Sequence, residues 1–324
     1  MGVALLAVGG VACQAAAPSE NIGVAQTAAT AADGYCRSTN CNPGPAYPQQ
    51  DETGTWECEP PGWSELCQEG RVPDPDNPGA FQDPRSNAPL WWRTACVGFD
   101  INATETGPLG YCDVLSATHG AFDAWTIARC PSAAGSLPPS IDDRDLGPVC
   151  GTPGYDPNGP NQNVIVFDDR TWTRDPSIAA VTTVTSDVET GEIVDADIEI
   201  NAVDHCFSTT LSQTPCPDPD EGLPFDLQSV LTHEIGHFFG LAHSPLADAV
   251  MYYSGDTDQG GMKRVLTPAD IAGICAIYPA DGTRSVATLV SPSGYEPEAA
   301  CDPTPKGGFA TQCPDGTSFP ECSL

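Results

Sequence analysis

The sequence predicts an α+β fold with disulfide-rich flanks. Four segments show strand patterns, three show the apolar spacing of helices, and Cys- and Pro-rich stretches precede and follow them. Gly 32 and Pro 33 make up about a fifth of the 324 residues, which is below the share typical of disordered chains. With 40% hydrophobic residues, the chain can form a core surrounded by long loops.

The strand patterns are short runs rich in β-branched residues, or runs in which apolar residues alternate with polar ones. We expect strands at residues 95–102, 163–167, 179–185 and 192–201. Residues 131–162 are rich in Pro, Gly and Asp, and we expect them to form a loop.

Three helices are expected. In residues 111–129, apolar residues recur with helical spacing. The second helix, 226–239, begins at Asp226, which is a suitable N-cap. The third covers residues 268–278 and has Thr267 as its N-cap.

The charge of the chain excludes one class of partner. Twelve Lys and Arg against 44 Asp and Glu give a net charge of −32. Phosphate backbones and anionic headgroups repel such a polyanion, so we expect no binding of nucleic acid. We also expect the protein to be a monomer. After the N-terminus, no apolar run reaches the ~18 residues that a membrane span requires.

Fifteen cysteines indicate an oxidising compartment, and therefore an extracellular or cell-surface protein. A short apolar run, residues 3–13, ends at Cys13 and resembles an export signal. Two interpretations stay open: a bacterial lipoprotein site at which Cys13 is lipidated, or a secretion signal removed together with Cys13. Either leaves 14 cysteines, an even number. Among them we expect the pairs Cys206–Cys216 and Cys96–Cys130.

Composition divides the chain into four parts. Residues 1–35 form the export signal and a flexible spacer, and residues 36–88 a Cys- and Pro-rich segment. The regular patterns lie in residues 89–280, the expected main domain. Residues 281–324 form a Cys-rich tail.

Three histidines follow a spacing that suits one metal ion. His233 and His237 are four residues apart, so on a helix they differ by ~40° and face one point. His243 would lie ~240° away on a continuing helix, and it reaches the same point only if the chain reverses. Gly240 permits the positive φ that such a reversal needs. Three imidazoles and one open position are typical of catalytic zinc.

Glu234 follows the first histidine and so lies beside the expected metal. A carboxylate at this place suits the general base that takes a proton from a zinc-activated water. The alternative is an amphipathic helix that carries histidines by chance. Since only five histidines occur in the chain and three fall within eleven positions, the metal site is favoured.

The residues from His233 to His243 (HEIGHFFGLAH) resemble the signature of the metzincin zinc endopeptidases. Met251 is similar to the methionine of their Met-turn, and its spacing from His243 resembles the matrixin branch. The resemblance covers about residues 89–280 and indicates a bacterial secreted or lipoprotein type. It implies a metzincin-like fold, in which a twisted five-stranded mixed sheet carries three helices. The substrate peptide would add as an antiparallel strand to an edge strand, expected at 179–185.

The same resemblance implies roles for the residues near the Met-turn. Met251 lies beneath the zinc without binding it. Tyr253 stands where matrixins usually have Pro, and Met251-Tyr252-Tyr253 also fits a Met-x-Tyr pattern in which a tyrosine is an extra ligand. For Tyr252 and Tyr253 we favour a role in a pocket or the core, with ligation as the alternative.

Asp195, Asp197 and Glu199 share one face of an expected strand. A Ca²⁺ ion or solvent could relieve the repulsion between them, and we favour a solvated face because the spacing matches no calcium loop.

These observations predict a secreted or surface-anchored zinc metalloendopeptidase. One Zn²⁺ is held by His233, His237 and His243, and Glu234 is the general base. The alternative is a non-catalytic, zinc-stabilised module that binds other surface proteins. Glu234 argues against this alternative, because a site without catalysis has no need of an unpaired carboxylate beside the ion.

Overall fold

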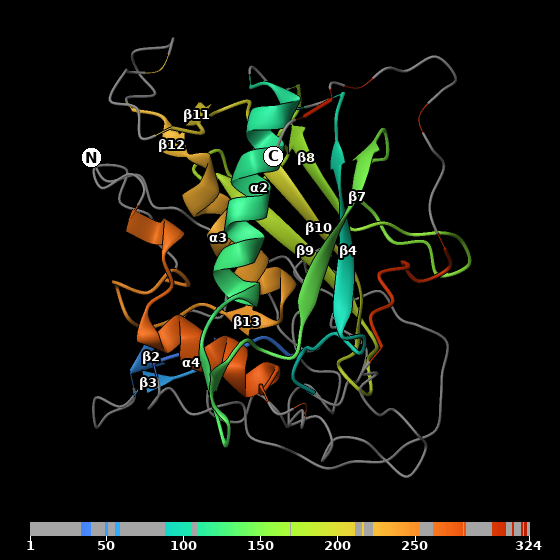
Figure 1. Cartoon of the computed structure of the whole chain (residues 1–324). Coiled ribbons are helices and arrows are strands. Elements are labelled where there is room, and N and C mark those ends of the chain that lie inside the picture. Colours follow the sequence, from blue (N-terminus) through green and yellow to red (C-terminus); the bar gives the residue numbers. More distant parts are fainter. Residues whose placement is uncertain are drawn as a thin grey trace, which may run out of the picture.

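A five-stranded mixed sheet forms the centre of the protein, and helices cover one of its faces (Figure 1). The computed structural model describes residues 34–39, 49–50, 56–58, 88–104, 106, 109–168, 170–210, 216, 223–252, 262–280, 282, 300–308, 313, 319 and 321–322. The predicted α+β class agrees with this sheet and with the three α-helices of the described residues. Cys13 and Tyr253 lie outside the described residues.

The strand order of the sheet is β7-β4-β8-β10-β9. Four of these strands run parallel, and β9 runs antiparallel to β10 at the edge. Their bounds are β4 Cys96–Asn102, β7 Asp142–Val149, β8 Val164–Asp168, β9 Ala180–Ser186 and β10 Ile193–Asn201. The segment expected at the edge, which forms β9, is therefore one of the two edge strands.

Among the described residues, four two-stranded pairings accompany the central sheet. They join β1 (Cys36–Arg37) to β13 (Leu241–Ala242), β2 (Gln49–Gln50) to β3 (Trp56–Glu57), β5 (Cys130–Ser132) to β6 (Gly135–Leu137), and β11 (Phe207–Ser208) to β12 (Phe225–Asp226).

The helices are α2 (Tyr111–Thr126), α3 (Leu227–Phe238) and α4 (Pro268–Ile277), with a short 3-10 helix, η3 (Met262–Arg264). Aromatic side chains join α2 and α3 to the sheet. Phe99 of β4 stacks on Phe122 of α2 with ring centroids 4.4 Å apart, and Phe122 meets Phe238 of α3 edge-on at 5.4 Å. This core holds α3 against the sheet. None of the described helices combines the length and the apolar character needed to cross a bilayer.

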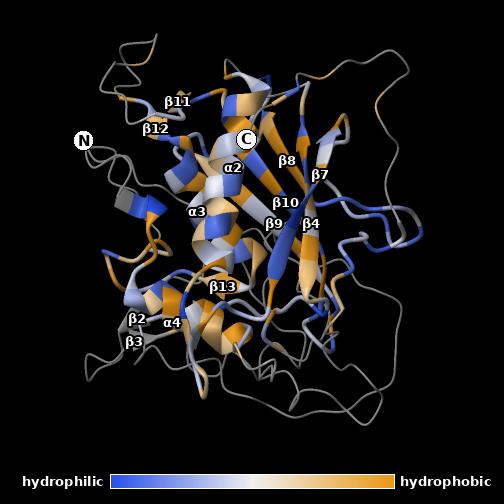
Figure 2. Cartoon of the chain, in the orientation of Figure 1, coloured by the Kyte–Doolittle hydropathy of each residue, from blue (hydrophilic) through white to orange (hydrophobic). Residues whose placement is uncertain are grey.

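The expectation of a loop at residues 131–162 is wrong in part, because this segment contains β7 and most of the β5–β6 hairpin. The sequence of β7, DDRDLGPV, has no apolar alternation, and the first half of this strand is hydrophilic in Figure 2. Its place at the sheet edge comes from parallel pairing with β4. Backbone pairing without burial of one face leaves no periodic signal in a sequence.

Six disulfides join described residues. They are Cys36–Cys58, Cys96–Cys301, Cys112–Cys322, Cys130–Cys275, Cys150–Cys313 and Cys206–Cys216. The expected Cys206–Cys216 pair is confirmed. The expected Cys96–Cys130 pair is wrong, because the C-terminal segment returns to the start of β4 and α4 lies beside β5. Bridges over such separations carry no local signal.

Candidate metal centre and active site

Helix α3 is fixed at both ends. At its start, the N-cap Asp226 accepts a hydrogen bond from Ser229 N at 2.8 Å. At its end, Trp92 Nε1 donates to Phe238 O at 2.7 Å, and the Tyr278 hydroxyl donates to Phe239 O at 3.1 Å. The first bond satisfies a backbone N–H, and the other two satisfy carbonyls, that a helix end leaves without intrahelical partners.

The chain reverses just after α3. Gly240 has a φ of 95°, a value that favours glycine. A Cβ here would lie 2.7 Å from Leu90 O, so the close passage of the 88–92 segment also requires glycine. The chain then forms β13 and brings His243 back toward the helix.

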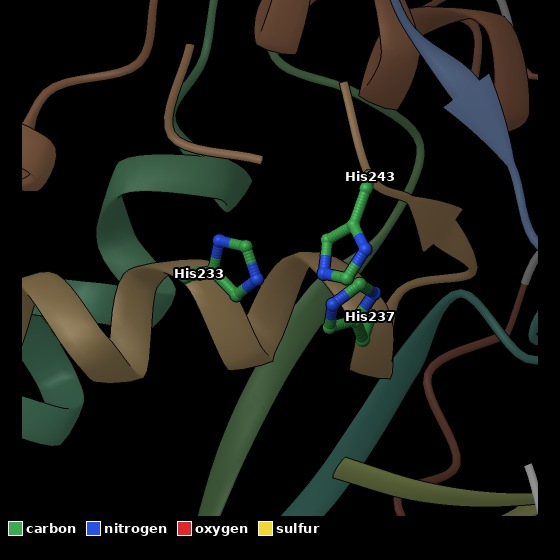
Figure 3. A group of neighbouring side chains, drawn as sticks. All are labelled: His233, His237 and His243. Atoms are coloured by element: carbon green, nitrogen blue, oxygen red, sulfur yellow. The ribbon is translucent and has the colours of Figure 1, made fainter. Parts of the chain in front are cut away.

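His233, His237 and His243 come together at this reversal. Figure 3 shows that the rings from α3 and the ring of His243 face a common point. One ring nitrogen of each lies within 4.8 Å of those of the other two, and all three side chains are buried. Within the described residues, no other group of three or more His, Cys, Asp or Glu is placed to hold a metal ion.

Two backbone carbonyls define the orientation of the helical histidines. His233 Nδ1 lies 2.7 Å from Val250 O, and His237 Nδ1 lies 2.8 Å from Leu241 O. A carbonyl can only accept, so each Nδ1 carries the proton and each Nε2 presents a lone pair. Nε2 of His233 and of His237 is buried and has no hydrogen-bond partner among the described residues.

Burial also keeps these rings neutral. It lowers the pKa of His237 to about 4, and it lowers the pKa values of His233 and His243 well below their usual range. Each neighbouring ring disfavours a positive charge on His243 as well. Three neutral imidazoles with converging nitrogens fit Zn²⁺, whose common ligands include imidazole nitrogen.

Glu234 is fully buried beside these rings. The Thr182 hydroxyl, on β9, lies 2.7 Å from Glu234 Oε2 and donates to it. Oε1 is also buried and has no hydrogen-bond partner among the described residues. Burial raises the pKa of the carboxyl to about 7, while the bond from Thr182 opposes this shift. One carboxylate oxygen is thus held, and the other is left for a reacting group.

Sequence reasoning missed Thr182, although one signal could have found it. Thr182 lies in the expected edge strand, and alternation along that strand places Thr182 on the same face as Ala180 and Val184, which are core residues. A buried threonine on the core-facing side of a strand needs a hydrogen-bond partner.

Met251 packs against α3 at Gly236, the residue that precedes His237. A Cβ on Gly236 would lie 2.1 Å from Met251 Sδ, so the Met251 side chain rests directly on the helix backbone.

Asp270 holds the turn that contains Met251, since its carboxylate accepts from Val250 N at 2.9 Å and from Met251 N at 3.1 Å. Tyr252 is half-buried, and Lys263 Nζ lies 5.6 Å from its ring centroid. The role of Asp270 was missed, although it is the N3 residue of the capping box of α4.

The expectation of a solvated acidic face is wrong. Asp195 and Asp197 are 2% and 1% exposed. Asp197 accepts from Val164 N at 2.8 Å and from Gly154 N at 2.7 Å, and Glu199 pairs with Arg174 at 2.7 Å. These protein groups partner Asp197 and Glu199, and burial beside Asp197 raises the pKa of Asp195 to about 9, which favours its neutral form. The structure does not support calcium.

Comparison with known proteins points to one family. Residues 153–279 match the family model described as Matrixin. Metalloendoproteinase 1-MMP of Arabidopsis thaliana is 50% identical over 54 residues, which are 16% of this chain and 14% of that protein. Metalloendoproteinase 2-MMP of the same plant is 45% identical over 56 residues, 17% of this chain and 14% of that protein. The chain thus spans about one seventh of the length of these relatives. Together with the converging histidines, the matches support a matrixin-like metzincin.

Proposed function

We propose that the protein is a zinc-dependent endopeptidase of the secreted or lipoprotein type. The observation that carries the proposal is the convergence of three buried imidazoles beside a buried carboxylate. The matrixin match over residues 153–279 supports the same activity. In this proposal His233, His237 and His243 hold the metal, and the domain at residues 89–280 carries catalysis between two disulfide-rich flanks.

The chemistry divides between the metal and Glu234. A zinc ion bound by the three histidines would supply Lewis acidity toward a water and a substrate carbonyl. Glu234 Oε1 takes the proton of the attacking water and then delivers it to the leaving amine. The bond from Thr182 to Oε2 keeps the carboxylate in one orientation during both transfers. Met251 supports the histidines from below without binding the metal.

We place the substrate along β9. This strand pairs with β10 on one side and has no partner strand on its other side among the described residues. Because Thr182 of β9 contacts Glu234, a peptide added to the open edge passes the histidine cluster. Main-chain hydrogen bonds would then hold substrates of varied sequence.

An exported protein accounts for the cysteines. Six disulfides among the described residues require an oxidising compartment. We propose an extracellular or cell-surface monomer whose N-terminal segment is either removed or lipidated at Cys13.

Metal analysis and a cleavage assay test the proposal. The purified full chain should bind one zinc ion and cleave an unfolded protein, and chelation should abolish cleavage. Glu234→Gln should retain zinc and lose at least ~100-fold in kcat, because the variant has no general base. Glu189→Gln, in the turn between β9 and β10, is the control and should cleave normally.

The outcomes separate two functions. Cleavage by Glu234→Gln at the normal rate would contradict the mechanism. Zinc binding without cleavage of any protein substrate would contradict the proposed activity and favour a zinc-stabilised binding module instead.

A further inference from the structure

The N-terminal strap, residues 34–39, crosses the segment that carries the third histidine. All six residues are buried, including the polar Arg37, Ser38 and Thr39. Cys36 and Arg37 form β1, which pairs with Ala242 and Leu241 of β13. In Figure 1, the blue strand of the strap lies beside β13. The strap therefore extends the metal-binding turn by one strand.

Ser38 meets the carbonyl that orients His237. Its hydroxyl donates to Leu241 O at 3.0 Å, and the same oxygen accepts from His237 Nδ1 at 2.8 Å. Ser38 N also donates to Gly240 O at 2.9 Å. The position of Leu241 O, and with it the direction of the His237 ring, is thus held from the strap.

The strap also meets the residues on both sides of His243. Ser244 Oγ donates to Gly34 O at 2.6 Å. On the other side, Cys36 and Cys58 form a small buried cluster with Ala242 and are joined by a disulfide. The two neighbours of His243 in the chain, Ala242 and Ser244, therefore each contact the strap or the disulfide that joins it to Cys58.

We propose that the N-terminal strap is a positioning element for the metal site, and that Ser38 is a positioning residue for His237. This inference rests on the proposed zinc site. Groups that orient metal ligands typically change metal affinity by about 10- to 100-fold when they are removed. Ser38 acts through a carbonyl shared with His237, so its loss should have an effect near the lower end of this range.

The first test replaces the hydroxyl. Ser38→Ala in the full chain should bind zinc about 10-fold more weakly in competition with a chromophoric chelator. The control is Ser132→Ala, which removes a hydroxyl-to-carbonyl bond of the same length, 3.0 Å, in the β5–β6 hairpin. Zinc affinity should be unchanged in this control.

A second test releases the strap from its disulfide. The double variant Cys36→Ser/Cys58→Ser should weaken zinc binding about tenfold or more, because β1 loses its covalent anchor. The control Cys150→Ser/Cys313→Ser removes the bridge that follows the C-terminal end of β7. Its zinc affinity should equal that of the wild-type chain. If Cys36→Ser/Cys58→Ser does not fold, Ser38→Ala decides alone.

The readouts separate the possible failures. If the strap only stabilises the fold, the substitutions will lower the free energy of unfolding of the metal-free protein and leave zinc affinity unchanged. This result would overturn the inference. If the wild-type chain binds no zinc, the proposed function itself fails. Weaker zinc binding in Ser38→Ala with a normal metal-free unfolding curve supports the inference.

Discussion

A single hydroxyl distinguishes the two oxygens of the Glu234 carboxylate. Thr182 donates to Oε2, and Oε1 has no hydrogen-bond partner among the described residues. A hydrogen bond to a charged group contributes about 1.5–3 kcal/mol, enough to hold the carboxylate in one rotamer. The oxygen that we propose to take the proton is therefore oriented before substrate binds.

Replacing Thr182 by Val should test this orientation. Because Val keeps the shape and removes the donor, Thr182→Val should lower kcat/KM about tenfold while zinc content stays at one per chain. Thr183→Val is the control, since its side chain lies on the other face of β9 near Arg174. Equal kcat/KM values for the two variants would contradict the role given to Thr182.

Gly240 should tolerate no side chain. Gly240→Ala combines a positive φ with a Cβ 2.7 Å from Leu90 O, so we expect a loss of ~2 kcal/mol or more in the free energy of unfolding. Gly135→Ala is the matched control, because φ there is 113° and no atom lies within 4 Å of the added Cβ. Urea unfolding measures both, and equal losses would show that the contact with Leu90 has no effect.

At the scale of elements, α4 supports the proposed metal site through one carboxylate. Asp270 caps its own helix and also accepts from Val250 N and Met251 N. Val250 O in turn accepts from His233 Nδ1. The start of α4, the Met-turn and the first histidine of α3 therefore form one connected network.

Asp270→Asn should weaken this network as a whole. The amide would place an NH₂ group against a backbone donor, and leaving such a buried donor unsatisfied costs about 1–3 kcal/mol. We expect a lower free energy of unfolding and weaker zinc binding, measured by urea unfolding and chelator competition. Asp123→Asn, exposed on α2, is the control. Unchanged zinc affinity in Asp270→Asn would show that the Met-turn does not position His233.

At the scale of the whole molecule, the fold depends both on local sequence patterns and on contacts between segments that are far apart in the chain. The caps of α3 and α4 and the four apolar strands were predictable, because caps and alternation are local properties of a sequence. The strand β7, the return of residues 300–308 to the start of β4, and the strap were not. They depend on pairings and disulfides between residues that are far apart in the chain, such as Cys96 and Cys301.

The candidate site was predictable to a similar extent. The spacing of His233, His237 and His243 indicated one metal ion, because helix geometry and one glycine determine where the rings point. The orienting partners, Thr182 and Ser38, come from segments about 50 and 200 residues away. Only the fold brings these hydroxyls to Glu234 and to Leu241 O.

The buried carboxyl pair should make the stability of the molecule depend on pH. Burial and the neighbouring Asp197 raise the pKa of Asp195 to about 9, against ~4 in an unfolded chain. Between these values the folded state holds more protons than the unfolded state, so stability falls as pH rises. Asp195→Asn should raise the free energy of unfolding by ~1 kcal/mol or more at pH 8 and reduce its decline from pH 5 to 8. Urea unfolding at several pH values would contradict this if both proteins showed the same slope.

Anomalous diffraction at the zinc edge, from crystals of the full chain, tests the central claim most directly. The account predicts one strong peak about 2.0–2.1 Å from Nε2 of His233, of His237 and of His243. A peak bound by other residues, or a His243 ring turned away from the two helical rings, would contradict it.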